Sequence, residues 1–143
     1  MAKDITPPPP GVYESYTHAN PSRVVRYAHL RRFEVVRRIV DETRPRSFVD
    51  WGAADGFLID AIFRSRNGAS IPEYVAAYEP IAEWAAKLRS KYDNARPATY
   101  VFSDIAGLAH DLESRGIKIE CLASLEVMEH LPLPERREFY DFC

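Results

Sequence analysis

The stretch Ser47-Phe-Val-Asp-Trp-Gly-Ala-Ala-Asp-Gly-Phe-Leu-Ile-Asp-Ala-Ile62 predicts a short buried strand, a tight glycine turn and the start of a helix. Bulky, β-prone residues at 48–51 favour the strand, and apolar residues at helical spacing from Phe57 favour the helix. Gly52 and Gly56 allow the backbone to turn sharply and to lie close to a ligand. Such a turn directs free N–H groups at the space above the end of the strand, which favours a polar or charged ligand there.

The turn fits one nucleotide-binding pattern poorly and another well. Counting the pyrophosphate fingerprint G-x-G-x-x-G from Gly52 places Ala54 at the second glycine and the bulky Phe57 at the third, where a small residue is needed. A better frame is Asp50-x-Gly52-x-Ala54-x-Gly56. In this frame the sequence resembles motif I of the class I S-adenosylmethionine-dependent methyltransferases, an acidic residue followed by three glycines at alternate positions. The sequence departs from that pattern at Ala54.

The two carboxylates of this stretch are consistent with the resemblance. S-Adenosylmethionine has a methionine ammonium, a sulfonium and no phosphate, so Asp50 and Asp55 suit it better than they suit a pyrophosphate. The resemblance therefore implies S-adenosyl-L-methionine as the cofactor, bound by Asp50, Gly52, Ala54, Asp55 and Gly56. The alternative interpretation is an ordinary strand–turn–helix unit in which Asp55 stabilises the first turn of the helix.

Length and composition restrict the classes of function. The chain of 143 residues has the length of one domain, and 46% of its residues are hydrophobic. Its net charge of −2 provides no basic surface, so we do not expect nucleic acid as a partner. No apolar run approaches the roughly 20 residues of a membrane span. Cys121 and Cys143 have no metal-site spacing and indicate free thiols, which favours a cytoplasmic location.

The N-terminal residues divide into an arm and a helix. Residues 1–20 contain the run Pro7-Pro-Pro-Pro10 and no apolar period, which predicts a solvated arm or a disordered tail rather than core. Asn20 then offers a helix N-cap with Pro21 at the first helical position. The helix is expected to end near Thr43, before Pro45.

The start of this helix shows a second resemblance. Asn20-Pro21-Ser22-Arg23 is similar to the Asn-Pro-Leu-Arg segment of ubiquinone-biosynthesis O-methyltransferases, whose arginine lies near the cofactor. The resemblance therefore implies Arg23 as a cofactor contact. The other arginines of the helix predict a solvated basic face or, alternatively, a surface for an anionic substrate.

A second strand is predicted over 74–78, and Glu79 follows it directly. In nucleotide-binding folds an acidic residue about 20 positions beyond the glycine turn, at the end of the second strand, binds ribose hydroxyls. Because a carboxylate can accept hydrogen bonds from both the 2′ and the 3′ hydroxyl, we expect Glu79 at the ribose. Ile81 and Ala82 would then line one side of the adenine, and Pro80 is a further expected cofactor contact. The alternative is that Glu79 is only an acidic residue at the start of the next helix.

A third strand is predicted over 99–102 and is followed by Asp104 and Ile105. In the methyltransferase pattern, the acidic residue after this strand accepts a hydrogen bond from the adenine amino group. The resemblance therefore implies that Asp104 and Ile105 contact the adenine. Asp104 also suits the N-cap of a helix over 105–115, and the two roles are compatible.

The fourth strand is expected over 117–125 and is followed by Glu126-Val-Met-Glu129-His130. This segment resembles motif IV in the form found in ubiquinone-type O-methyltransferases, where a short strand ends in Glu-x-x-Glu-His. The resemblance implies that the backbone at Leu125 contacts the cofactor. It implies that Glu126, Glu129 and His130 face the substrate pocket.

Several roles are open to these last three residues. His130, with Glu129, is the candidate general base for a hydroxyl acceptor, since imidazole suits proton transfer near neutral pH. A structural histidine at the strand–helix junction is the alternative. If the segment is helical, Glu126, Glu129 and His130 share one face and could ligate Mg²⁺, Mn²⁺ or Zn²⁺. Small-RNA 3′-terminal 2′-O-methyltransferases use a similar set with a further histidine, but no histidine follows His130 in this sequence, so no metal is expected.

These observations predict an α/β fold with a Rossmann-like parallel sheet of strand order 3-2-1-4 and helices on both faces. A complete domain of the family has seven strands in the order 3-2-1-4-5-7-6, so residues 21–143 resemble only its N-terminal part. The fourth strand is then an exposed edge at which chains could associate. We expect methyl transfer from S-adenosylmethionine to a small-molecule acceptor, through oxygen. The alternatives are a non-catalytic S-adenosylmethionine-binding module and a metal-dependent RNA 2′-O-methyltransferase.

Overall fold

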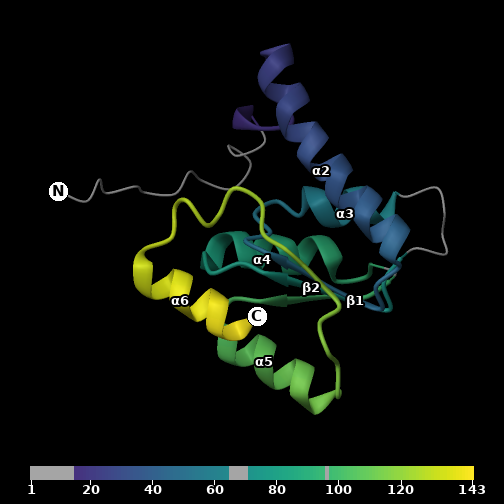
Figure 1. Cartoon of the computed structure of the whole chain (residues 1–143), viewed down its shortest axis with the longest axis vertical. Coiled ribbons are helices and arrows are strands. Elements are labelled where there is room, and N and C mark those ends of the chain that lie inside the picture. Colours follow the sequence, from purple (N-terminus) through teal and green to yellow (C-terminus); the bar gives the residue numbers. More distant parts are fainter. Residues whose placement is uncertain (1–14, 65–70, 96) are drawn as a thin grey trace.

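The computed structural model describes residues 15–64, 71–95 and 97–143, in which four parallel strands form one sheet. The strand order β3-β2-β1-β4 confirms the predicted topology (Figure 1). The strands are β1 (Ser47–Trp51), β2 (Tyr74–Tyr78), β3 (Thr99–Phe102) and β4 (Cys121–Ala123). The helices are α2 (Arg23–Thr43), α3 (Phe57–Phe63), α4 (Ala82–Tyr92), α5 (Ile105–Ser114) and α6 (Leu133–Phe142). Among the helices described, none has both the length and the apolar character needed to cross a membrane.

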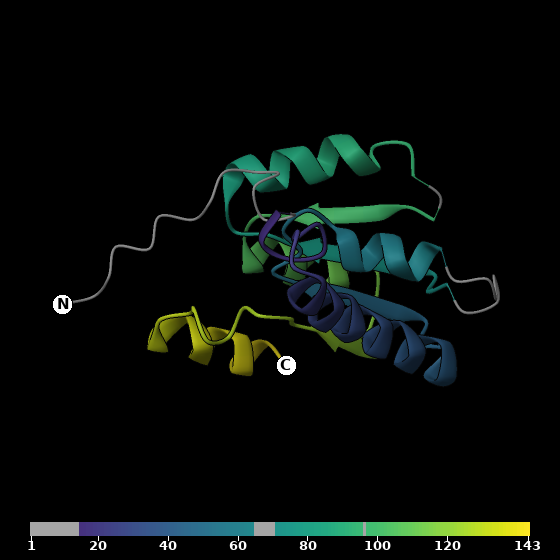
Figure 2. The same cartoon turned by 90° about the horizontal axis from the view of Figure 1, so that it is seen from above.

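Helices cover both faces of the sheet, as predicted, because successive side chains of each strand point to opposite faces. In β1, Phe48 belongs to the core cluster under α2, α3 and α4. Val49 and Trp51 belong to the cluster under α5 and α6. Figure 1 shows α2 and α3 above the strands and α5 and α6 below them, and Figure 2 shows α4 along β3. The carboxyl ends of all four strands therefore lie at one edge, between two layers of helices.

The fourth strand is shorter than predicted. Only Cys121–Ala123 pairs with β1, where a strand over 117–125 was expected. Residues before it are attached by side chains instead: the Ser47 hydroxyl donates to the Lys118 carbonyl oxygen at 2.6 Å and accepts from the Glu120 amide at 2.8 Å. These bonds replace the backbone ladder, which explains the late start of β4. β4 is an edge of the sheet, and association through it remains a prediction.

The N-terminal segment packs more closely than predicted. α2 begins at Arg23 with Ser22 as its N-cap, two residues after the expected start, because Asn20 accepts the Ser22 amide in a tight turn (2.9 Å) instead of capping the helix. The end of the predicted arm is not solvated, since Thr17 is 3% exposed and the ring of His18 stacks on Phe57 with centroids 3.9 Å apart. The proline run lies outside the described residues.

Candidate functional site

The residues between β1 and α3 form a turn in which every second residue has a left-handed backbone. The φ angle is 81° at Gly52, 47° at Ala54 and 76° at Gly56. Backbone amides close the turn: Gly52 and Ala53 donate to the carbonyl oxygen of Tyr78 at 2.8 and 3.1 Å, and Gly56 donates to that of Ala53 at 2.7 Å. The spacing of small residues recognised in the sequence therefore corresponds to a backbone that requires them.

Glu79 joins the end of β2 to this turn. One carboxylate oxygen accepts the Ala54 amide at 2.9 Å, and the other accepts the Ile81 amide at 3.0 Å. Glu79 is 3% exposed, and burial raises the pKa of its carboxyl group, an effect that the two hydrogen bonds oppose. Each oxygen retains a second lone pair, so Glu79 can both hold the turn and accept hydrogen bonds from a ligand.

Two more carboxylates, those of Asp50 and Asp55, line a cavity of about 20 Å³ beside the turn. Burial, then the charges of Glu79 and Asp55, raise the pKa of Asp50 to about 8. Asp55 accepts the Phe57 amide at 3.1 Å through Oδ1. Its Oδ2 is buried, accepts no hydrogen bond within the described residues, and lies 3.8 Å from Nε2 of His18. The space has room for about one water-sized group, and its charge favours a cation.

A cavity of about 560 Å³ lies over the carboxyl ends of β1, β2 and β4. It brings together three sequence features that are far apart in the chain: the turn after β1, the acidic residue after β2 and the segment after β4. Tyr16 and Trp84 add aromatic walls. The predicted site residues that line it are Gly52, Ala54, Glu79, Pro80, Ile81, Leu125, Glu126, Glu129 and His130.

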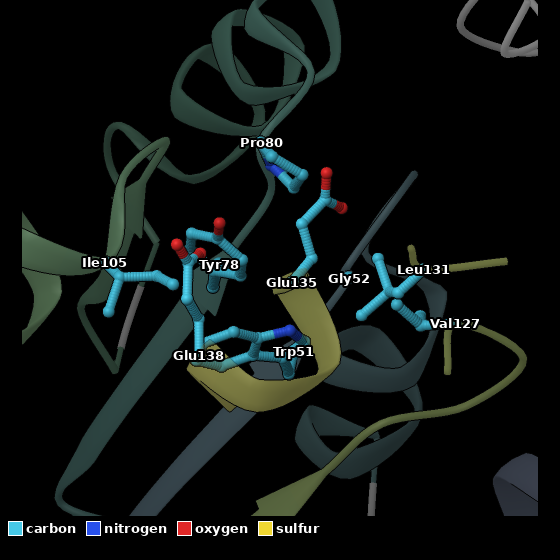
Figure 3. Close-up of a pocket in the computed structure, with 9 residues that line it drawn as sticks. All are labelled: Trp51, Gly52, Tyr78, Pro80, Ile105, Val127, Leu131, Glu135 and Glu138. Atoms are coloured by element: carbon cyan, nitrogen blue, oxygen red, sulfur yellow. The ribbon is translucent and has the colours of Figure 1, made fainter. Parts of the chain in front are cut away.

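A second cavity, of about 280 Å³, adjoins the first and shares with it Gly52, Pro80, Val127 and Leu131. Trp51 and Tyr78 line it, with their ring centroids 4.2 Å apart. Ile105 forms one side, and Figure 3 shows Glu135 and Glu138 of α6 directed into the cavity. Burial first, and then the charges of Glu138 and Glu135, raise the pKa of Tyr78. This cavity is therefore aromatic and acidic.

The C-terminal end of α4 supports the turn from behind. The Tyr92 hydroxyl lies 2.8 Å from the Gly56 carbonyl oxygen and 2.9 Å from Oδ1 of Asp60. Lys91 donates to the Asp55 carbonyl oxygen at 2.7 Å and pairs with Asp60 at the same distance. Burial, then Asp60, raise the pKa of Tyr92, so its hydroxyl remains a donor. α4 thus fixes the two carbonyl groups at the end of the turn.

Among solved structures, a crystal structure of the methyltransferase domain of the bacterial protein CtHen1-CN superimposes on this chain with a TM-score of 0.62. The chain shares its fold with a methyltransferase domain. Sequence identity is 16%, over 78% of this chain and 57% of that one, so this chain spans little more than half of that domain. No family model and no curated protein matches the sequence.

Six residues predicted to contact the cofactor line neither of the two larger cavities. Asp50 and Asp55 line the small cavity instead, Gly56 closes the turn, and Ala82 begins α4. The other two are Asp104 and Arg23. Asp104 is exposed and is the N-cap of α5, accepting the Gly107 amide at 2.7 Å, which confirms its capping role. Arg23 is exposed at the first position of α2. Their contacts with the cofactor remain predictions.

The segment after β4 contacts α2 through Glu126. Glu126 has a φ of 59°, pairs with Arg32, and lies 3.0 Å from Nδ1 of His29. Burial, then the charge of Arg32, lower the pKa of His29. The helical grouping considered for Glu126, Glu129 and His130 does not form, since residues 128–130 make a turn. In the described part of the chain, no three His, Cys, Asp or Glu residues are arranged to hold a metal ion.

Several residues that line the two larger cavities were not predicted from sequence. Tyr16 lies in the segment interpreted as a solvated arm, and Glu135 and Glu138 lie on α6, whose position depends on packing. A signal existed for Trp51 and Tyr78, which end β1 and β2 and therefore reach the carboxyl edge of the sheet.

Proposed function

We propose that this chain binds S-adenosylmethionine at the carboxyl edge of the sheet and supports transfer of its methyl group to an acceptor, with oxygen as the expected nucleophile. The observation that supports this proposal is the shared 560 Å³ cavity, which the turn after β1, Glu79 and the segment 125–131 line together. In open α/β sheets, ligands bind at this edge. The fold shared with a methyltransferase domain is consistent with the proposal.

The described residues fit the three parts of the cofactor. The methionine ammonium suits the small acidic cavity between Asp50 and Asp55. The ribose hydroxyls suit the remaining lone pairs of Glu79. The adenine suits the aromatic cavity beside Pro80 and Ile105.

The adenine amino group has better-placed partners than the one predicted. Asp104 does not line the 280 Å³ cavity, and its Oδ1 accepts the Gly107 amide. Glu135 and Glu138 line the 280 Å³ cavity, and no other described residue engages their carboxylates in an ion pair or a hydrogen bond. We therefore assign the amino group to α6 and retain for Asp104 the role of fixing the start of α5.

We propose that two residues of the segment after β4 assist the transfer. When bound, the cofactor supplies an electrophilic methyl group on a sulfonium. His130 and Glu129 line the same cavity and are exposed at its rim, where either could accept a proton from an acceptor hydroxyl. The principal contribution of the protein is orientation, since holding the acceptor in line with the methyl group lowers the barrier without covalent chemistry.

Calorimetric titration with S-adenosylhomocysteine and with NAD⁺ tests the proposal. We expect S-adenosylhomocysteine to bind and NAD⁺ not to bind. Glu79→Gln should weaken binding by about tenfold or more, because the amide replaces one acceptor oxygen by a donor. Glu113→Gln, which changes an exposed carboxylate of α5, should bind as the wild type does.

Two further measurements separate the possible failures. Near-UV circular dichroism establishes that Glu79→Gln is folded, and Tyr16→Ala offers a second, surface-exposed change in the same cavity. Tight NAD⁺ binding without S-adenosylhomocysteine binding would refute the proposal. Cofactor binding without methyl transfer to any acceptor would support a non-catalytic S-adenosylmethionine-binding module. Chelator-sensitive methylation of RNA would support a metal-dependent RNA 2′-O-methyltransferase.

A further inference from the structure

Three of the residues that line the larger cavity are glutamates, and one is a histidine, His130. Glu79, Glu126 and Glu129 line it, and none of its lining residues is lysine or arginine. An acceptor with a phosphate or carboxylate group would therefore meet like charge, whereas a cationic acceptor would meet opposite charge in a partly enclosed space.

These three carboxylates differ in their availability. Glu79 accepts two backbone amides, and Glu126 is engaged by His29 and Arg32. Glu129 is exposed at the rim, and within the described residues its carboxylate makes no ion pair or hydrogen bond. Among these three carboxylates, Glu129 is thus the one that remains available to a ligand.

The same cavity offers aromatic surface. Tyr16 lines it and is 63% exposed, and Trp84 lines it from α4. Aromatic faces attract cations and stack on flat apolar rings. A ligand that combines a cationic group with a flat ring would use both kinds of wall at once.

We infer that the acceptor of the proposed methyl transfer is a small aromatic molecule with an ammonium group, its cation directed to Glu129 and its ring placed against Tyr16 and Trp84. This inference rests on the proposed function, because it assigns the acceptor of the same site. It also argues against RNA as acceptor, since the phosphates would face Glu129 in a cavity whose described lining residues include no lysine or arginine.

Three phenols that share one ring test the charge preference directly: tyramine, tyrosol and 4-hydroxyphenylacetate are cationic, neutral and anionic. Each is titrated into the full chain saturated with S-adenosylhomocysteine. We expect tyramine to bind about tenfold more tightly than 4-hydroxyphenylacetate, with tyrosol between them, and we expect added salt to reduce the difference.

Matched variants assign the preference to its residues. Glu129→Gln should remove most of the advantage of tyramine over tyrosol, whereas the exposed Glu113→Gln on α5 should leave it unchanged. Tyr16→Ala should weaken all three phenols by similar factors, because it removes ring contact and not charge. Both binding-site residues are exposed, so neither change is expected to unfold the chain.

The outcomes separate the inference from the proposed function. Equal or tighter binding of 4-hydroxyphenylacetate, or no binding of tyramine at millimolar concentration, would overturn the inference while cofactor binding persists. Failure of S-adenosylhomocysteine to bind would instead overturn the proposed function on which the inference rests.

Discussion

Two parts of the larger cavity are built by different means. One is the turn of residues 52–56, the cofactor wall, to which we assign the cofactor, and the other is residues 125–131, the acceptor wall. On the cofactor wall, the amides of Gly52 and Ala53 donate to Tyr78 at the end of β2, and the amide of Ala54 donates to Glu79. Side chains of α4 fix the carbonyl groups that follow.

On the acceptor wall, residues 125–131 have one internal backbone hydrogen bond, from the His130 amide to the Val127 carbonyl oxygen. Helix side chains supply the other contacts: His29 and Arg32 of α2 contact Glu126, and Arg136 of α6 donates to the Leu131 carbonyl oxygen at 2.8 Å. One wall is therefore fixed by hydrogen bonds to its backbone groups, whereas the other is positioned mainly by side chains of two helices.

The largest effect is expected at the end of the cofactor turn, for Gly56→Ala. The φ of 76° is unfavourable for alanine, and the added Cβ would collide with the Tyr92 hydroxyl and lie 2.9 Å from Cδ2 of Leu88. We expect a loss of about 3 kcal/mol in the free energy of unfolding, measured by urea denaturation.

Gly116→Ala provides the matched control for that change. Its φ is 64°, but a Cβ there would meet nothing within 4 Å, so only backbone strain of about 1 kcal/mol is expected. If both variants lose the same stability, the turn is not tightly packed against α4, and the contrast between the two walls is wrong.

The second effect concerns the pH dependence of stability and involves Asp50. Its pKa is raised from 3.8 to about 8, so the folded protein retains a proton that the unfolded chain releases. Below the pKa that Asp50 has in the unfolded chain, this group costs the wild type no stability. Above it, the stability of the wild type falls as pH rises toward 8. Asp50→Asn cannot titrate, so its stability relative to wild type should increase by about 2 kcal/mol between about pH 6 and about pH 8.

Denaturant titrations at several pH values measure this slope. The exposed Asp141→Asn on α6 serves as the control and should follow the wild type. A relative stability of Asp50→Asn that does not change with pH would mean that Asp50 is ionised in the folded protein, and that the cofactor wall is less enclosed than its burial indicates.

Sequence patterns predicted the turn of residues 52–56 and the strands beside it because their determinants are local. The strands 74–78 and 99–102 were predicted to the residue, since each is a short β-prone run flanked by breaking residues. The turn and Glu79 also follow from spacing, because the backbone angles at Gly52 and Gly56 restrict which residues fit.

The acceptor wall could not be predicted in the same way. The Glu-x-x-Glu-His pattern located the segment, but the pairing of Glu126 with Arg32 depends on how α2 packs across the sheet. The packing of Tyr16 against the cavity and the direction of Glu135 on α6 likewise depend on tertiary contacts that leave no periodic pattern. The short β4 results from the Ser47 side chain, which periodicity does not detect.

A smaller effect is expected for Arg32→Ala, which removes a partner of Glu126. Arg32 is about half exposed, so the change should cost less than about 1 kcal/mol in global stability. Amide hydrogen exchange should nevertheless become faster in residues 125–131 and remain unchanged in residues 52–56. Arg31→Ala, which breaks a pair with Glu34 inside α2, is the control and should change neither segment. Faster exchange on both walls would show that they are coupled.

The smallest effect, and one of opposite sign, is expected for Ala54→Gly. Ala54 occupies a left-handed backbone at a φ of 47°, which costs an alanine roughly 1–2 kcal/mol, whereas glycine loses roughly 0.5–1 kcal/mol more entropy on folding. The net result should be a stabilisation of about 0.5 kcal/mol, seen as a small rise in Tm. Ala53→Gly is the matched comparison: Ala53 is buried and has no left-handed φ, so the same change there should destabilise the chain by about 1 kcal/mol. Opposite signs at adjacent positions would show that the cofactor wall is fixed residue by residue through its backbone angles, whereas equal losses would show that packing around the turn outweighs them.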